Sequence, residues 1–187
     1  MCAYSRSMTA FDESAALPQD IIDMFARSGV ALTIADCTRP DSPLVGVNQA
    51  FLDLSGYPAE AVIGRNCRFL QPQEGPGPVR RRMRQFLRSP EQYDEKFVVP
   101  NVTRDGQPFL NLVYMAKLAR GGETTHVLGS QFAIDAPGRL DPALYDRALS
   151  EDLRQIDVRA RDAGWTLLGS FNVLASSHSI IARARMD

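Results

Sequence analysis

Gly64-Arg65-Asn66-Cys67-Arg68-Phe69-Leu70-Gln71 is the most informative segment of this 187-residue chain. It places a single thiol between an amide and a guanidinium, and a second amide follows four residues later. A buried structural cysteine usually has apolar neighbours, whereas Cys67 is flanked on both sides by hydrogen-bonding groups. This setting indicates a polar ligand close to the sulfur. A lone thiol is nevertheless more often inert than reactive, so these residues alone leave the chemistry at Cys67 open.

The composition is that of an ordinary globular protein, with 44% hydrophobic residues, 23% charged residues and a formal net charge of −1. This balance does not point to nucleic acid or to anionic lipid as a partner. The cysteines Cys2, Cys37 and Cys67 are odd in number and widely spaced, which argues against a disulfide framework. The N-terminus lacks the pattern of a signal peptide. We therefore expect a cytoplasmic protein.

The order of the expected elements indicates an α/β fold with an antiparallel sheet. Residues 1–17 are weakly patterned and are expected to be a mobile leader, and a short amphipathic helix follows up to Gly29. Strands are expected at 30–35, 44–47, 95–103, 108–118 and 125–134, and short helices at 48–54 and 58–62. Three parts result: a leader with a cap helix (1–29), a core (30–136) and a C-terminal extension of two helices (137–187).

Side-chain amides gather on one face of the last three expected strands. Alternation along a strand puts Asn111 on the same face as Val113 and Met115, and Gln131 on the same face as Val127 and Gly129. Asn101 can join them from the strand before. An unpaired buried amide costs about 1–3 kcal/mol, so the amides either face a flat ligand with donors and acceptors or bond to one another or to water.

The segment around Cys67 resembles the signature of LOV domains, the flavin-binding blue-light sensors of the PAS superfamily, at every position. Residues 48–51 and 55–57 resemble the run that leads into the cysteine helix of that family. The resemblance extends over residues 30–134. It breaks at Val113 and Val127, where the family usually has an aromatic residue, and at Pro72, where a glycine usually follows the motif.

The resemblance implies a PAS-type core that holds FMN between the cysteine helix and the concave face of the sheet. In that family, light leads the cysteine sulfur to add reversibly to the C4a carbon of the flavin, which gives this role to Cys67. Gln131 would relay the signal by rotating its amide. Arg68 and Arg84 stand where the family has its phosphate-binding arginines. The full implied cofactor set is Asn66, Arg68, Leu70, Gln71, Arg84, Asn101, Asn111, Val113, Met115, Val127, Gly129 and Gln131.

The helix expected after the loop at 72–78 carries five arginines in nine residues. Such a helix suggests nucleic-acid binding when aromatic side chains are interleaved on its exposed face, and here they are not. The pattern is therefore interpreted as a solvated face. The arginines are Arg80, Arg81, Arg82, Arg84 and Arg88.

Large apolar residues occupy the opposite face of the last two strands, and burial favours covering them. They are Leu110, Leu112, Tyr114, Leu118, Leu128, Phe132 and Ile134. Helices are expected at 141–164 and at about 170–185. The second is too polar to span a membrane, and the whole segment carries equal numbers of arginines and acidic residues, unlike a DNA reader. We expect a packing element and a homodimer built from the sheet face and the terminal helices.

No effector pattern follows the core, so a sensor without enzymatic turnover is expected, similar to bacterial short-LOV proteins. An alternative is a flavin-binding PAS redox sensor without adduct chemistry, and a weaker one is a small thiol enzyme. His126 and His178 have no cysteine or carboxylate at ligand spacing, so no metal site is expected. Such a sensor is expected to signal through a change of association or by contacting a separate protein partner, which the sequence does not identify.

Overall fold

The computed structural model describes residues 9–133 and 165–167. The helical elements are η1 (Glu13–Ala15), α1 (Gln19–Arg27), α2 (Gln49–Ser55), η2 (Ala59–Ala61), η3 (Cys67–Leu70) and α3 (Val79–Arg88). The strands are β1 (Ala10–Phe11), β2 (Ala31–Asp36), β3 (Leu44–Val47), β4 (Asp94–Val102), β5 (Pro108–Arg120), β6 (Glu123–Ala133) and β7 (Trp165–Leu167).

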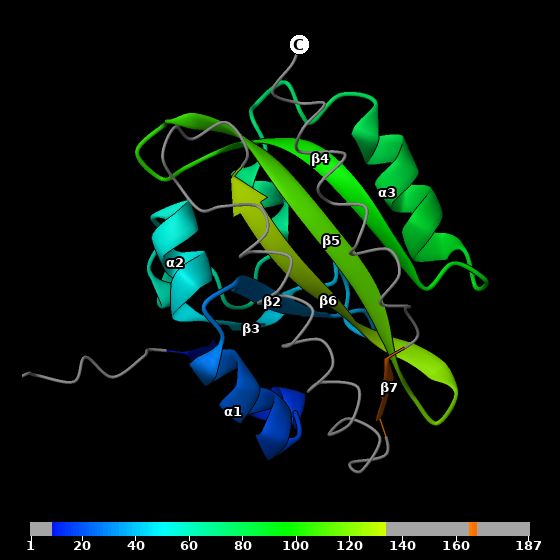
Figure 1. Cartoon of the computed structure of the whole chain (residues 1–187). Helices are drawn as coiled ribbons and strands as arrows, with labels where there is room; N and C mark the ends of the chain where they lie inside the picture. The colour runs from blue at the N-terminus through cyan, green and yellow to red at the C-terminus, as the bar shows by residue number, and fades with distance from the viewer. Residues whose placement is uncertain (1–8, 134–164, 168–187) are drawn as a thin grey trace, which may run out of the picture.

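The described strands form one antiparallel sheet in the order β1-β3-β2-β6-β5-β4, and β7 pairs with β5. The fold class expected from the sequence is confirmed, because helices pack on both faces of this sheet. In Figure 1, α2 lies to the left of the long strands and α3 to their right. The strands expected from alternation are all present, with ends shifted by two residues or fewer.

The two tight turns of the β4–β6 meander lie where the glycines predict them. Gly106 and Gly122 have φ values of 84° and 87°, a conformation that glycine adopts without strain. These turns fix the register between neighbouring strands, so that Val99 lies opposite Asn111 and Val113 lies opposite Gln131. The register brings the amide-bearing positions of the three strands together.

Asn48 joins the start of α2 to β2. Its Oδ1 accepts from the backbone N of Leu32 at 2.9 Å and of Phe51 at 3.1 Å, and its Nδ2 donates to the carbonyl of Val30 at 2.7 Å. One buried side chain therefore caps the helix and bonds the edge of the strand that it packs on. This fixes the helical layer that carries the cysteine segment against the concave face of the sheet.

The expectation of a mobile leader up to residue 17 is wrong for residues 10–15. Ala10 pairs with Val47 and Phe11 with Gly46, and the Phe11 ring lies 5.6 Å from that of Phe25. A two-residue strand is too short to show alternation, so no periodic pattern marks it in the sequence. Gly46 makes the pairing possible, because a Cβ there would stand 2.6 Å from the Phe11 ring.

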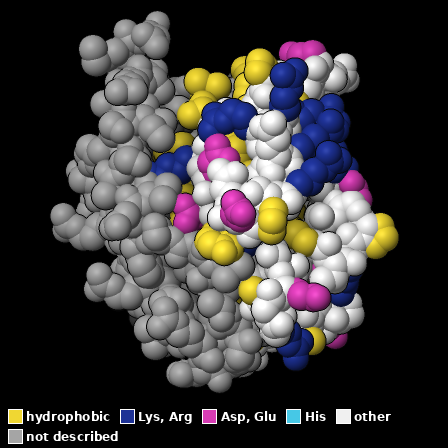
Figure 2. All heavy atoms as spheres, turned by 90° about the vertical axis from the view of Figure 1, so that its right-hand side faces the viewer, with side chains coloured by type: hydrophobic (Ala, Val, Ile, Leu, Met, Phe, Trp, Pro, Cys, Tyr) yellow, Lys and Arg dark blue, Asp and Glu magenta, His cyan; other side chains and the backbone are white. Residues whose placement is uncertain are grey.

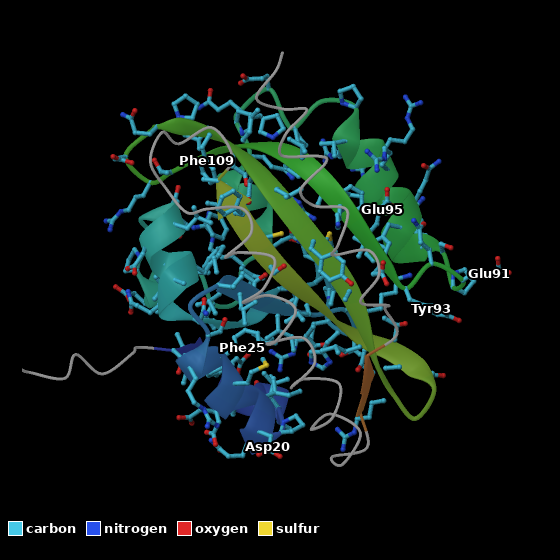
Figure 3. The ribbon with its side chains drawn as sticks, viewed as in Figure 1. Asp20, Phe25, Glu91, Tyr93, Glu95 and Phe109 are labelled. Atoms are coloured by element: carbon cyan, nitrogen blue, oxygen red, sulfur yellow. The ribbon has the colours of Figure 1, made fainter. Side chains whose placement is uncertain are left out.

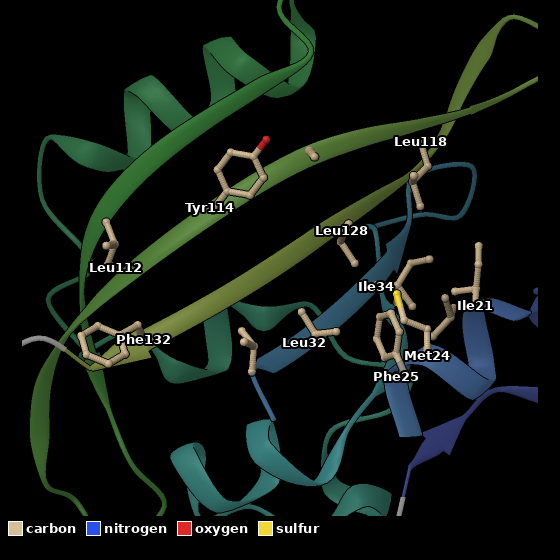
Figure 4. Packing of buried hydrophobic residues seen from close by; sticks show 13 residues of the cluster. Ile21, Met24, Phe25, Leu32, Ile34, Leu112, Tyr114, Leu118, Leu128 and Phe132 are labelled. Carbon is tan, nitrogen blue, oxygen red and sulfur yellow. The ribbon is translucent and has the colours of Figure 1, made fainter. Parts of the chain in front are cut away.

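Five of the seven apolar residues expected on the outer face of the sheet are buried, as the sequence predicts, while Leu110 is partly buried and Ile134 lies outside the described residues. Leu112, Tyr114, Leu118, Leu128 and Phe132 form one cluster with Ile21, Met24 and Phe25 of α1 (Figure 4). Helix α1 therefore supplies part of the cover of this face. The helices expected at 141–164 and 170–185 lie outside the described residues. Strand β7 falls in the extension, at a place where no strand is expected.

We predict that Gly46→Ala lowers the free energy of unfolding by about 1–3 kcal/mol, because the added methyl overpacks the contact between Phe11 and Ile34. Urea unfolding followed by circular dichroism measures the change. Gly29→Ala is the matched control, since a Cβ there meets no atom within 4 Å. Equal stability of the Gly46→Ala variant and the wild type would contradict the packing of the N-terminal strand.

Candidate functional site

The cysteine segment is held to the loop between β2 and β3 by Asn66. The Oδ1 of Asn66 accepts from the backbone N of Arg68 at 3.0 Å and so caps η3, while its Nδ2 donates to the carbonyl of Asp41. The Phe69 ring packs edge-on against Tyr57 with centroids 4.9 Å apart. These contacts fix the short helix on both sides, so that Cys67 faces a cavity rather than solvent.

The cavity lies between η3, α3 and the concave face of the sheet, and its volume is about 510 Å³ when the open space at its mouth is included. The enclosed space that the centre of a water-sized molecule can reach is smaller, about 60 Å³. Its lining is mostly apolar, with a thiol on one side and amides on the other. The lining residues are Thr33, Ala35, Leu44, Cys67, Leu70, Gln71, Met83, Val99, Asn101, Asn111, Val113, Met115, Val127, Gly129 and Gln131.

Most of the site residues expected from the sequence meet in this cavity. Those that line it are Cys67, Leu70, Gln71, Asn101, Asn111, Val113, Met115, Val127, Gly129 and Gln131. Asn66, Arg68 and Arg84 do not line it: Asn66 holds the cysteine segment, and both arginines are exposed.

Five lining residues were not expected: Thr33, Ala35, Leu44, Met83 and Val99. Thr33 and Ala35 alternate along β2 in the same way as the residues of β6 that they neighbour. The period-2 rule applied to β2 would therefore have found them. Met83 is the residue through which α3 reaches the cavity.

The three amides form one hydrogen-bonded chain across β4, β5 and β6. Asn111 Nδ2 donates to Asn101 Oδ1 at 2.8 Å and to Gln131 Oε1 at 2.7 Å. Gln131 Nε2 donates in turn to Thr33 Oγ1 at 3.4 Å. The amides therefore do bond to one another, which was one of the two alternatives that the sequence left open.

Although the amides bond to one another, one of their hydrogen-bond acceptors has no donor. Both hydrogens of Asn111 Nδ2 are used, and its Oδ1 is buried without a hydrogen-bond partner in the described part of the chain. A buried acceptor without a donor costs about 1–3 kcal/mol. A flat ring whose edge carries N–H and C=O groups fits this site, because the ring N–H can donate to Asn111 Oδ1. The residues present thus fit a flavin.

The thiol of Cys67 is kept protonated by its surroundings. Burial raises the pKa of this thiol above its ordinary value, and the nearby Arg68 guanidinium lowers the pKa by less. At neutral pH the side chain therefore carries its proton and is not a thiolate nucleophile. This disfavours a thiol enzyme, which needs an ionised sulfur or an adjacent base.

Arg68 has a partner at the surface. Its guanidinium forms an ion pair with Asp41, and the two side chains are 52% and 59% exposed. Both residues line a shallow hollow beside the cysteine segment, together with Arg65 and Asn66. An exposed pair of this kind contributes little to stability, so Arg68 can exchange Asp41 for another anion at low cost.

Residues 9–133 and 165–167 show neither the features of a metal centre nor those of a membrane-spanning helix. No cluster of three or more histidine, cysteine or acidic side chains there has the arrangement of a metal site. No helix in the same residues has both the length and the apolar character required to cross a membrane.

Comparison with known proteins gives a consistent set of matches. Residues 29–132 match the family model described as PAS domain. The blue-light-activated histidine kinase 1 of Erythrobacter litoralis is 37% identical over 127 residues, which are 67% of this chain and 35% of the kinase. This chain thus spans about a third of that relative's length.

Solved structures match over more of the chain. The LOV protein of Rhodobacter sphaeroides has a TM-score of 0.73 and 29% identity, over 90% of this chain and 95% of that one. A structure named RsLOV d2 variant has a TM-score of 0.74 and 30% identity, over 94% of this chain and 98% of that one. These two likenesses therefore cover nearly the whole of the matched chains.

We predict that Thr33→Val lowers the free energy of unfolding by about 1 kcal/mol, because it removes the acceptor of a buried amide N–H. Urea unfolding gives the value. A double-mutant cycle with Gln131→Leu is the control, since Thr33→Val should cost less once the amide is absent. Equal costs in both backgrounds would show that Thr33 does not hold the Gln131 amide.

Proposed function

Because the chain belongs to the PAS domain family and, within it, to the LOV photoreceptors, we propose that it senses blue light through FMN bound in the cavity. The unpaired Oδ1 of Asn111 carries this proposal, because it calls for a donor on the edge of a flat ligand. The thiol of Cys67 lines the same cavity, so one ligand can meet both groups. The apolar side chains between them suit the rest of a ring system.

When bound and excited by blue light, a flavin would supply an electrophilic C4a carbon and a basic N5. These two atoms could take up the sulfur and the proton of one thiol without a further oxidant or reductant. Cys67 contributes both the sulfur and the proton, and its raised pKa keeps that proton in place beforehand. Its position at the start of η3, capped by Asn66, keeps the sulfur directed at the cavity.

Gln131 is the proposed relay. Its amide is bonded on one side by Asn111 and on the other by Thr33. A rotation that exchanges Oε1 with Nε2 breaks the contact with Asn111, because two NH₂ groups then face each other, and it requires the Thr33 hydroxyl to donate instead of accept. A donor that becomes an acceptor changes which neighbours it can bond. Gln131 lies in β6, two residues before the end of the strand, so the rearrangement has a short route toward residue 134 and the extension beyond it.

We propose that the output is a change in the packing of the helical extension or in the association of a homodimer, without enzymatic turnover. The division into 1–29, 30–136 and 137–187 and the cytoplasmic location remain predictions. The described part of the outer sheet face is already buried within one chain, so a dimer would rest more on the terminal helices than on that face. The alternative is a redox sensor that binds flavin without adduct formation.

We predict that Cys67→Ala retains bound flavin but loses the reversible loss of visible absorption under blue light, because ring contacts come from other residues. Absorption spectra before and after illumination measure both quantities. Cys37→Ala is the matched control: Cys37 is partly buried but does not line the cavity, so bleaching should persist. Bleaching of the Cys67→Ala protein would rule out the adduct, and a wild type that binds flavin without bleaching would favour the redox sensor.

We further propose that Arg68 and Arg84 hold the FMN phosphate, although both lie outside the cavity lining. A charge-assisted contact contributes about 1.5–3 kcal/mol, so replacing both by alanine should lower the affinity for FMN relative to riboflavin by about tenfold or more. Titration of the flavin-free protein with the two flavins gives the ratio. Arg27→Ala, exposed on α1, is the control. An unchanged ratio of the two flavin affinities would show that both arginines are ordinary solvent-exposed side chains that do not bind the phosphate.

A further inference from the structure

The five arginines of α3 divide into two groups by the face on which they lie. Arg82 faces the sheet, where it forms an ion pair with Glu95 and lies 5.4 Å from the centroid of the Phe97 ring. Phe86 is fully buried on the same side of the helix, and Met83 lines the cavity. The side chains on this side of α3 therefore pack against the sheet or line the cavity.

The other four arginines share the outward face. At about 100° per residue, Arg80, Arg84, Arg88 and Arg81 fall within an arc of about 100°, over a length of roughly 12 Å. All four are exposed, and their side chains have no hydrogen bond or ion pair in the described part of the chain. Figure 2 looks at the side that carries α3 and shows Lys and Arg side chains gathered over it.

A solvated helix face does not need this arrangement. Like charges three or four residues apart repel along a helix, and this stripe contains such pairs at Arg80–Arg84 and Arg84–Arg88. The chain as a whole has a net charge of −1, so the positive charge is a local concentration rather than a general property of the surface. An anionic partner would relieve the repulsion.

Two apolar side chains accompany the stripe. Leu87 and Tyr93 are the large hydrophobic residues exposed among those that the structure describes, at 44% and 45%. Leu87 borders the stripe on α3 itself, and Tyr93 lies in the loop that follows the helix (Figure 3). A surface that combines arginines with exposed apolar and aromatic residues has the composition of a protein interface.

We propose that this outward face of α3, with Leu87 and Tyr93, is a docking surface for an acidic amphipathic helix of a partner protein. Carboxylates spaced three and four residues apart on such a helix repeat at the same interval as the arginines, and guanidinium groups bind carboxylates in pairs of hydrogen bonds. An apolar residue beside the carboxylates would cover Leu87.

Nucleic acid fits the surface less well. Binding along a phosphate backbone needs a broad basic field, whereas Glu91 and Glu95 lie close to this helix and the whole chain is slightly acidic (Figure 3). The apolar side chain of Leu87 has no donor or charge with which to bind a phosphate group. The stripe shares Arg84 with the proposed phosphate site, and Met83 connects the same helix to the cavity. Arg80, Arg81 and Arg88 have no role in the proposed photochemistry, so the arginine substitutions in the test are confined to them.

The test uses the full chain in darkness and two synthetic helical peptides of identical composition. One peptide has glutamates in a stripe at spacings of three and four residues beside a leucine, and the other has the same residues scrambled around the helix. Fluorescence anisotropy should show that the striped peptide binds about tenfold more tightly than the scrambled one. The triple variant Arg80→Gln/Arg81→Gln/Arg88→Gln should lose at least about tenfold in affinity, and Leu87→Ser several-fold.

The control variant Arg27→Gln/Arg104→Gln/Arg120→Gln removes the same charge from exposed arginines elsewhere and should bind like the wild type. Arg68 and Arg84 are left in place, so the flavin content of each variant reports separately on the proposed cofactor site. Equal affinity for both peptides, or equal loss in the two triple variants, would overturn the proposal. Tighter binding to a DNA duplex than to the striped peptide would overturn the choice of a protein partner.

Discussion

The buried amide oxygen of Asn111 is the constraint around which the cavity is arranged. Three neighbouring strands each contribute one amide, and the register of β4, β5 and β6 brings them within hydrogen-bond distance. A slip of one residue in that register would turn all the side chains of a strand to the opposite face. The glycine turns that fix the register therefore also fix the site, and the acceptor left over on Asn111 defines what the site can bind.

The second half of the site is positioned by a different set of contacts. Asn66 caps the short helix of Cys67 and ties it to the loop between β2 and β3, while Asn48 ties the helical layer to the edge of β2. The thiol and the amides thus come from opposite walls of one cavity. A ligand between them would be held by groups whose positions are set by the strand register on one wall and by the side-chain bonds of Asn48 and Asn66 on the other.

Alternation along β5 and β6 was enough to predict their part of the concave face, because residues such as Asn111, Met115 and Gln131 follow a strict period of two. The role of the cysteine segment in the site was predicted from its resemblance to a known family signature. The pairing of Arg68 with Asp41 could not be predicted, since it joins residues far apart in the chain at an exposed site. Strands β1 and β7 are two and three residues long, too short to leave a periodic pattern in the sequence.

The central claim is that the Cys67 thiol carries its proton in darkness, and that its S–H bond breaks when the flavin absorbs light. Infrared difference spectroscopy of the FMN-loaded protein, light minus dark, observes that bond directly. The account predicts the loss of an S–H stretching band on illumination, its return in darkness, and no such change in Cys67→Ala. A flavin that bleaches while the S–H band stays unchanged would contradict it.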